Sequence, residues 1–96
     1  MAQPDHVPFN ALRVVDAVVR GRSYSSAGQE LSVTHSAVSQ TIKRIETELG
    51  IILFERKGNE MQATPAALQL SAAYASAVKS LQSSIENVTH GVYDVR

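Results

Sequence analysis

The sequence predicts a small, mainly α-helical fold in which three short helices precede a β-hairpin and a long helix follows it. Two observations support this fold class. Apolar residues recur every three or four positions in four separate stretches, as expected for helices with one buried face. A β-prone stretch containing Gly58-Asn59 lies between the third and fourth of them, and these two residues tolerate the positive φ of a tight hairpin turn.

The first helix is expected to begin at Pro8 and to end at Gly21. Proline needs no backbone N–H in a first turn, and glycine takes the left-handed conformation that closes many helices. The polar residues Arg13, Asp16 and Arg20 fall off the apolar stripe of this helix. That stripe consists of Phe9, Leu12, Val15, Val18 and Val19.

The second helix is expected to begin after an N-cap at Ser25, which we prefer to Ser23, with Tyr24 packing inward just before it. Gly28 lies inside this helix and costs about 1 kcal/mol relative to alanine. We explain that glycine by a close approach of the third helix.

Ser32 and Val33 are expected to form the turn to the third helix, with the Val33 side chain in the core. Thr34 is the candidate N-cap of this helix and Gly50 ends it. Its buried stripe repeats at spacings of four, three and four, through Val38, Ile42, Ile45 and Leu49. Its opposite face is polar and carries His35, Ser36, Ser39, Gln40 and Lys43. Two helices joined by so short a turn form a helix-turn-helix, whose second helix enters the major groove of DNA.

The hairpin is predicted from a strand over Ile51–Arg56, a turn over residues 57–60 and a return strand over Met61–Ala63. A hairpin directly after a recognition helix is a wing. The fold class is therefore a winged helix-turn-helix, with a three-helix body and a β-hairpin wing.

Thr64 and Pro65 are expected to start a long helix that runs to about His90. At about 1.5 Å per residue it is longer than the small body needs. Its heptad-like apolar stripe indicates a homodimer seam, formed by Leu70, Tyr74, Val78, Leu81, Ile85 and Val88. The alternative is that Tyr74, Val78, Leu81 and Ile85 belong to the core of one chain. We thus expect a DNA-binding domain over residues 1–64, a linker or dimerisation helix over 65–90 and an unstructured tail over 91–96.

Composition narrows the class of protein. A chain of 96 residues holds one core, and without cysteine it has neither disulfides nor thiolate metal sites. It shows no apolar run of membrane-spanning length and no signal-peptide pattern, so we expect a cytoplasmic protein without a membrane partner. His6, His35 and His90 lie in unrelated segments, and no motif for phosphate binding or metalloprotease chemistry is present. We therefore expect no enzyme, no cofactor, no metal and no small-molecule ligand on this fragment.

The formal net charge is zero, which counts against nucleic-acid binding because phosphate contacts usually come with a basic domain. Around the third helix and the hairpin, four basic residues alternate with four acidic ones. They are Lys43, Arg44, Arg56 and Lys57, against Glu46, Glu48, Glu55 and Glu60. We expect modest non-specific affinity for DNA.

The order of elements and the wording of three segments resemble the N-terminal domain of the LysR-type transcriptional regulators. Asn10–Arg20 is similar to that family's first helix, Ser23–Leu31 to its second, and Val33–Arg56 to its recognition helix and wing entry. The stretch V-T-H-S-A-V-S-Q resembles the branch that holds the glycine-cleavage activators and β-lactamase regulators. The chain departs from the family at Gly28 and Thr41, where alanine and glutamine are usual, and over residues 63–67, where L-T-x-A-G is usual.

The resemblance implies a sequence-specific, dimeric DNA-binding domain of a bacterial regulator. Two recognition helices would enter successive major grooves of a partly palindromic operator, and the wings would contact the flanking minor grooves. It also implies a C-terminal effector-binding domain that this chain does not contain and that makes a tetramer possible. The alternative function is a winged-helix module that binds protein without specific DNA binding.

The candidate DNA contacts follow from position and chemistry. The N-terminus of the third helix, capped by Thr34, carries partial positive charge and suits a phosphate. Base edges are expected to be contacted by His35, Ser36, Ser39 and Gln40, of which glutamine is suited to adenine. Lys43 and Arg44 are expected at phosphates, although Arg44 can instead pair with Glu48.

Two further groups of candidates flank the third helix. The resemblance identifies Arg56 as the wing arginine, which would enter the minor groove or hold a phosphate; a surface ion pair with Glu55 or Glu60 is the alternative. Lys57 and, more weakly, Asn59 are the other wing candidates. Ser23, Ser25 and Ser26 can bind phosphate at the start of the second helix, with simple capping as the alternative.

Overall fold

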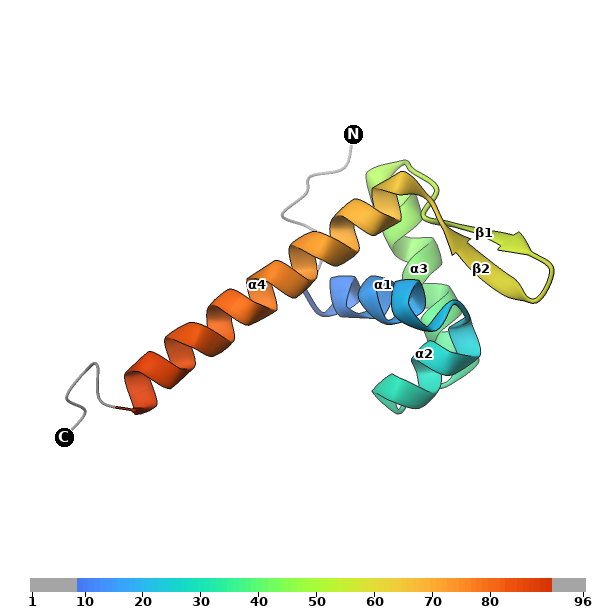
Figure 1. Ribbon diagram of the computed structural model, residues 1–96. Helices are drawn as coiled ribbons and strands as arrows, with labels where there is room; N and C mark the ends of the chain where they lie inside the picture. The colour runs from blue at the N-terminus through green and yellow to red at the C-terminus, as the bar shows by residue number, and fades with distance from the viewer. Residues whose placement is uncertain (1–8, 91–96) are drawn as a thin grey trace.

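The computed structural model describes residues 9–90, which form four helices and one two-stranded antiparallel hairpin (Figure 1). In chain order the elements are α1 (Phe9–Gly21), α2 (Tyr24–Leu31), α3 (His35–Leu49), β1 (Phe54–Lys57), β2 (Glu60–Ala63) and α4 (Pro65–Thr89). This order confirms the predicted mainly α, winged helix-turn-helix fold. The helix start expected at Pro8 and the tail expected over residues 91–96 lie outside the described residues.

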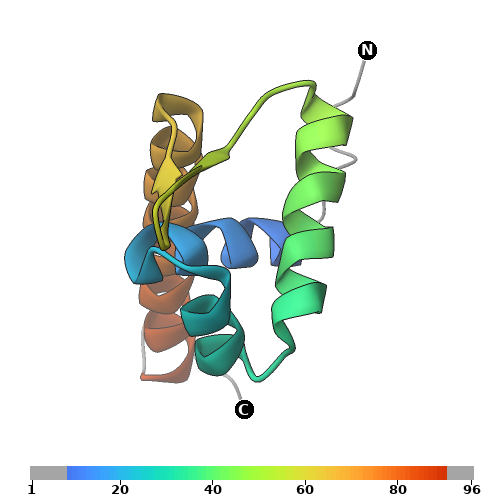
Figure 2. The same cartoon turned by 90° about the vertical axis from the view of Figure 1, so that its right-hand side faces the viewer.

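α1 packs against α2, α3 and α4, so it is the centre of the body (Figure 2). In that view α3 and α4 lie on opposite sides of α1. The predicted stripe of α3 is confirmed, since Val38, Ile42 and Ile45 are fully buried and Leu49 is half-buried beside them. The core is completed by apolar residues from the other elements: Ala11, Val15, Ala17, Val18, Ala27, Leu53, Phe54 and Ala67.

The stripe predicted for α1 is only partly right. Val15 and Val18 are buried as expected, but the Phe9 side chain is exposed and its ring packs on Tyr74 of α4, with the ring centroids 5.1 Å apart. Asp16, which we expected off the stripe, is buried. A carboxylate is tolerated there because it receives hydrogen bonds from two side chains, Arg20 and Ser71.

Two helix ends differ from the prediction by one or two residues. α1 is closed by Arg22, not by Gly21: Arg22 has φ 60°, and its N–H donates to the carbonyl of Val18 at 2.8 Å. α2 begins two residues earlier than expected, because Ser23 is its N-cap and accepts from the N–H of Ser26 at 2.9 Å. Ser25, the preferred cap, lies inside the first turn.

The turn between α2 and α3 is built differently from the expectation. Ser32 has φ 60° and caps α2, while Val33 is 44% exposed instead of filling the core. The Val33 N–H donates to the carbonyl of Gly28 at 2.9 Å, so the backbone of this turn folds back over α2. A Cβ on Gly28 would lie 2.7 Å from the Val33 carbonyl oxygen. Gly28 therefore does permit a close approach, but the backbone that approaches is the turn before α3 and not, as we expected, α3 itself.

The hairpin pairs Phe54 with Ala63 and Lys57 with Glu60. Its first strand is therefore shorter than predicted and begins after Leu53, whereas its second strand is one residue longer and begins at Glu60. Gly58 has φ 62° in the two-residue turn, as the sequence suggested. Asn59, the second turn residue, does not have a positive φ. A glycine alone at the first turn position is typical of a II′ turn.

α4 starts at Pro65 behind an N-cap at Thr64 and extends away from the body as a long arm (Figure 1). Thr64 accepts from the N–H of Ala67 at 3.4 Å, so the helix begins where the sequence predicted although residues 63–67 depart from the family wording. The first half of α4 covers α1, whereas its last three turns are exposed. Over residues 9–90, none of the helices combines the length and apolarity that crossing a membrane requires.

Candidate nucleic-acid interface

The outer face of α3 is a polar surface with a charged end. Ser36, Gln40 and Lys43 lie along one line of the helix, with Ser39 and Arg44 beside them, opposite the buried stripe. All are exposed except Ser39, which is half-buried. Toward the C-terminal end of α3 this surface is hollowed between Gln40, Lys43, Arg44, Thr47 and Glu48. Sequence reasoning did not single out Thr47 for the site.

The N-terminus of α3 is open to solvent and favours an anion. Thr34 is exposed, and its hydroxyl accepts from the N–H of Ala37 at 3.0 Å, which confirms the predicted cap. The first turns of both α2 and α3 contain no acidic residue that would cancel their partial positive charge. Ser25 and Ser26 are exposed in the first turn of α2.

An aromatic row beneath His35 joins three elements. The ring of Tyr24, the first residue of α2, lies edge-on to His35 with centroids 5.7 Å apart and perpendicular to Phe54 of β1 at 6.4 Å. Burial raises the pKa of Tyr24, the nearby carboxylate of Glu46 raises it further, and the positive charge of Arg56 opposes both. The His35 ring therefore rests on Tyr24 at the edge of α3, with the wing close by.

The wing is attached to the body by three sets of hydrogen bonds. The Glu46 carboxylate accepts from the N–H groups of Leu53 and Phe54, at 2.8 and 3.4 Å. The Thr64 hydroxyl donates to the carbonyl of Ile52 at 2.8 Å. The Met61 N–H donates to the carbonyl of Arg22 at 2.9 Å, which joins β2 to the turn between α1 and α2. The sequence indicates Glu46 only as a negative charge near the site, because its structural role depends on a loop geometry that sequence spacing does not show.

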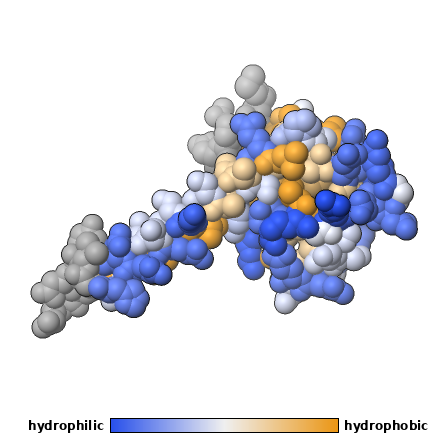
Figure 3. All heavy atoms as spheres, in the orientation of Figure 1, coloured by the Kyte–Doolittle hydropathy of each residue, from blue (hydrophilic) through white to orange (hydrophobic). Residues whose placement is uncertain are grey.

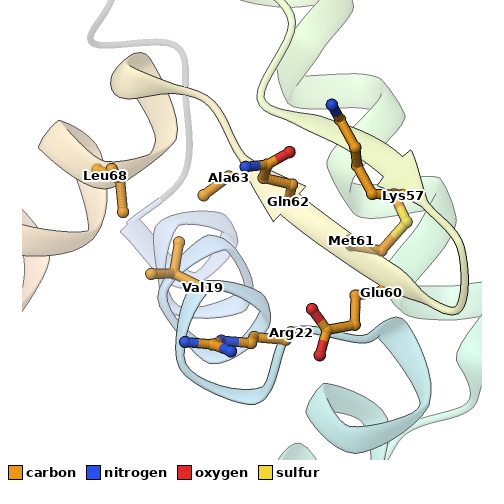
Figure 4. Close-up of a pocket in the computed structure, with 8 residues that line it drawn as sticks. All are labelled: Val19, Arg22, Lys57, Glu60, Met61, Gln62, Ala63 and Leu68. Atoms are coloured by element: carbon orange, nitrogen blue, oxygen red, sulfur yellow. The ribbon is translucent and has the colours of Figure 1, made fainter.

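A hollow of about 570 Å³ lies behind the wing, at its junction with α1 and α4 (Figure 4). Val19, Ala63 and Leu68 gather on one side of it, and Arg22, Lys57 and Glu60 lie around the rest. β2 nevertheless packs on the body beside this hollow, because Met61 and Ala63 lie against the core.

The cations of α3 and the wing are not neutralised by ion pairs. Among residues 9–90, side-chain ion pairs within 4.0 Å involve Arg20 alone, which contacts Asp16 and Glu30. The alternative pairs of Arg44 with Glu48, and of Arg56 with Glu55 or Glu60, are therefore not formed. Arg56 and Lys57 are both exposed on β1. In the described part of the chain there is also no cluster of three metal-ligating side chains.

The residues predicted for the dimer seam divide into two groups. Leu70 packs against the core of its own chain, and the Tyr74 ring contacts Phe9. Val78 is half-buried at the edge of the body. Leu81, Ile85 and Val88 are exposed by 54%, 60% and 43%. An apolar hollow of about 230 Å³ lies among these three residues.

Comparison with known proteins assigns the family. The family model described as "Bacterial regulatory helix-turn-helix protein, lysR family" matches residues 9–68. The chain is 47% identical over 57 residues to the glycine cleavage system transcriptional activator of Escherichia coli, covering 59% of this chain and 19% of that one. It is 34% identical over 88 residues to the HTH-type transcriptional regulator BlaA of Proteus vulgaris, covering 92% of this chain and 30% of that one.

Solved structures show the same architecture. A probable transcriptional regulator of Pseudomonas aeruginosa, PA0477, superposes with a TM-score of 0.77 at 37% identity, over 86% of this chain and 28% of that one. The DNA-binding domain of BenM, in a complex with benA site 1 DNA, shares the fold with a TM-score of 0.77 at 24% identity, over 85% of this chain and 95% of that one.

The chain spans about a fifth to a third of the length of the curated relatives it matches. Those relatives are transcriptional regulators and not enzymes, and members of the branch that the sequence resembles, a glycine-cleavage activator and β-lactamase regulators, are among them. The chain belongs to the lysR family of bacterial regulatory helix-turn-helix proteins, which are DNA-binding regulators of transcription.

Proposed function

We propose that this chain binds a partly palindromic operator as a homodimer in the bacterial cytoplasm, with α3 in the major groove and the wing in the adjacent minor groove. The observation that carries this proposal is the outer face of α3. It is polar, exposed and free of carboxylate partners along Ser36, Gln40 and Lys43, and the wing cations lie at its side. A BenM domain of the same fold has been solved on DNA, which supports this docking.

The positions of the side chains divide them into two roles. Base edges are within the expected reach of the N-terminal half of α3, where His35, Ser36, Ser39 and Gln40 lie. Phosphates are the expected ligands of the cations and of the helix N-termini. This second group comprises Ser25, Ser26, Thr34, Lys43, Arg44, Arg56 and Lys57.

Zero net charge is compatible with this function because three of the carboxylates are engaged within the fold and the cations of α3 and β1 stay unpaired among the described residues. Glu46 receives two backbone N–H groups, and Asp16 and Glu30 pair with Arg20. The free cations thus face outward from α3 and β1, while the total field of the domain stays weak. Affinity for arbitrary DNA is expected to be modest, and base contacts would supply most of the discrimination.

The homodimer would form through the outer half of α4. Leu81, Ile85 and Val88 form an exposed apolar stripe that the body of the same chain does not cover. The face of this arm seen in Figure 3 is mainly hydrophilic, in keeping with a stripe confined to one side of the helix. A second copy supplies an identical stripe, and a helix pair with heptad-like spacing buries both. Val78 would lie at the border, and an additional effector domain would allow a tetramer.

The test is a selection of binding sites from a random-sequence DNA library, performed with the purified chain at two salt concentrations. A dimeric regulator domain should enrich a spaced, two-fold symmetric motif, and its affinity should fall steeply with salt. If a folded dimer enriches no motif at either salt concentration, specific DNA binding by this chain is refuted.

The alternative is a winged helix that binds protein. The neutral net charge favours it, but the outer face of α3 does not. Protein interfaces concentrate aromatic and methionine anchors, and the exposed face of α3 between Ser36 and Arg44 contains none. Binding to DNA that is insensitive to salt would point back to this alternative.

A further inference from the structure

One buried polar contact joins α4 to the body. The Ser71 hydroxyl of α4 donates to Oδ1 of Asp16 in α1 at 2.7 Å, across 55 positions of sequence. Both residues are almost fully enclosed, with 7% and 8% of their surface exposed. A hydroxyl bound to a buried carboxylate makes a short, directional and charge-assisted hydrogen bond.

The same carboxylate continues the contact toward the helix-turn-helix. Its Oδ2 accepts from Nε of Arg20 at 2.9 Å, one turn further along α1. The guanidinium of Arg20 then donates to both carboxylate oxygens of Glu30 in α2, at 2.8 and 2.6 Å. Ser71, Asp16, Arg20 and Glu30 therefore form one polar chain from α4 through α1 to α2. Across the described residues, every buried side-chain polar atom has a hydrogen-bond partner.

The remaining contacts between α4 and α1 are apolar. Ala67 is buried, Leu70 packs against the core, and Tyr74 lies on Phe9 with the rings tilted by 38°. Apolar contacts of this kind are non-directional and tolerate small rotations of one helix on another. The hydrogen bond of Ser71 is the contact that favours one rotation of α4 over nearby rotations, because a hydrogen bond weakens steeply as its angle departs from the preferred geometry.

We propose that Asp16 and Ser71 are positioning residues that fix the orientation of α4 on the body and thereby set the spacing between operator half-sites. The argument for spacing rests on the dimer proposed above. If two copies join through the outer half of α4, a change in the angle between α4 and the body of each copy moves α3, which lies on the other side of α1. The distance between the two recognition helices then depends on the angle at which α4 packs on the body around Ser71.

The orientation can be measured without DNA. Because the chain has no cysteine, spin labels can be placed at Gln29→Cys on α2 and Ser83→Cys on α4, both exposed positions. Doubly labelled chain diluted in a large excess of unlabelled chain reports the distance within one protomer. The parent should give one narrow distance distribution, and Ser71→Ala should broaden or shift it.

Ser76→Ala is the matched control, since it makes the same change at an exposed position of α4 with the same gain in helix propensity. It should leave the distance distribution unchanged. A general loss of stability would lower the melting temperature without widening the distribution of the folded molecules. A Ser71→Ala distribution as narrow as that of Ser76→Ala, with the same mean, would overturn the proposal.

A second arm tests the consequence for DNA, with half-sites held constant and the spacer length varied. Ser71→Ala should lose about tenfold of the parent's preference for one spacer, the equilibrium factor at the lower end for a hydrogen bond to a charged group, while keeping the half-site sequence. An unchanged spacer preference would contradict the proposal. If the parent selects no DNA motif, the dimeric-operator proposal fails, and the spin-label distances still decide the role of Ser71 and Asp16 in positioning α4.

Discussion

Gln40 occupies the middle of the exposed face of α3, one turn beyond Ser36 and one turn before Lys43 and Arg44. Its amide can donate and accept at once, as adenine N6 and N7 require, so Gln40→Ala should remove discrimination at one or two base pairs by about 1–3 kcal/mol. Binding to single-base variants of the selected operator measures this. Gln29→Ala, on the exposed face of α2, should leave the base preferences intact. A uniform loss of affinity over all sequences would show that Gln40 holds the backbone only.

Arg56 is exposed on β1 and makes no ion pair among the described residues, so its charge is available to a phosphate or to the minor groove. Arg56→Ala should weaken binding to all sequences and reduce the slope of log affinity against log salt by about one. Lys79→Ala removes one positive charge from α4, far from the wing, and should leave the slope nearly unchanged. Equal slopes for Arg56→Ala and the parent would exclude Arg56 from the phosphate contacts.

At the scale of single residues, local chemistry was predictable and tertiary contact was not. Thr34 and Thr64 were identified as N-caps because capping depends on the three residues that follow. The choice of Ser25 over Ser23 failed where two serines compete, since Ser23 has the extended backbone of a cap, with φ −159° and ψ 152°, and Ser25 is already helical. The burial of Asp16 depends on Ser71, which lies 55 positions away, so the local sequence pattern around Asp16 does not predict this burial.

At the scale of elements, Gly28 determines how closely the turn before α3 approaches α2. A methyl group there would lie 2.7 Å from the Val33 carbonyl oxygen, a backbone atom that cannot move alone. Gly28→Ala should therefore destabilise the fold by about 1–3 kcal/mol through overpacking, although alanine is the better helix former. Urea unfolding measures the loss, and Gln29→Ala on the exposed side of α2 should be neutral or stabilising. A Gly28→Ala protein as stable as the parent would mean that the turn can shift.

The ion pair between Arg20 of α1 and Glu30 of α2, here called the clamp, predicts a dependence of stability on pH. The hydrogen bond from Arg20 lowers the pKa of Glu30 below its ordinary value of 4.5. Its stabilising contribution is therefore complete above that value and is lost as the pH falls through the lower pKa of the folded state. The contribution is small because the Glu30 side chain is 42% exposed.

Glu30→Gln should accordingly be less stable than the parent at neutral pH and should lose less stability in acid. Urea midpoints recorded from neutral pH to about pH 3.5 follow this difference through the titration of Glu30. Glu86→Gln, at an exposed position of α4, should keep the acid response of the parent. If Glu30→Gln and the parent lose stability in parallel, the clamp does not contribute in solution.

Element order was the most predictable level of the fold, and element boundaries were less so. The four apolar stripes and the Gly58 turn were sufficient to place four helices and a hairpin in sequence. The first strand begins later than predicted because the carboxylate of Glu46 binds the N–H groups of Leu53 and Phe54, which holds the approach to β1 against α3. Val33 illustrates the same limit, since its backbone and not its side chain closes the turn.

At the scale of the whole molecule, α3 and α4 lie on opposite sides of α1, so the proposed DNA surface and the proposed dimer surface do not compete (Figure 2). Sequence spacing predicted one continuous seam on α4. The structure divides it, with Leu70 and Tyr74 packed on the chain's own body and Leu81, Ile85 and Val88 exposed. A heptad-like stripe cannot by itself show where intramolecular packing stops, because both kinds of packing use the same spacing.

The exposed part of this stripe leads to a prediction about assembly. Leu81→Glu would place two carboxylates, one from each copy, in an apolar seam without partners, which should weaken the dimer by about 3 kcal/mol or more. Sedimentation should then show monomers at concentrations where the parent is dimeric. Operator affinity should fall with it, since each half-site would be bound without the effective concentration that the second provides.

Ser83→Glu is the matched control, because Ser83 is exposed and lies on the side of α4 opposite Leu81. It introduces the same charge in the same turn, so it should leave both the dimer and the operator affinity nearly unchanged. An intact dimer in the Leu81→Glu protein would place the interface elsewhere. Monomers that keep full affinity for a two-fold symmetric operator would show that DNA alone brings the two copies together, with α4 acting only as a linker.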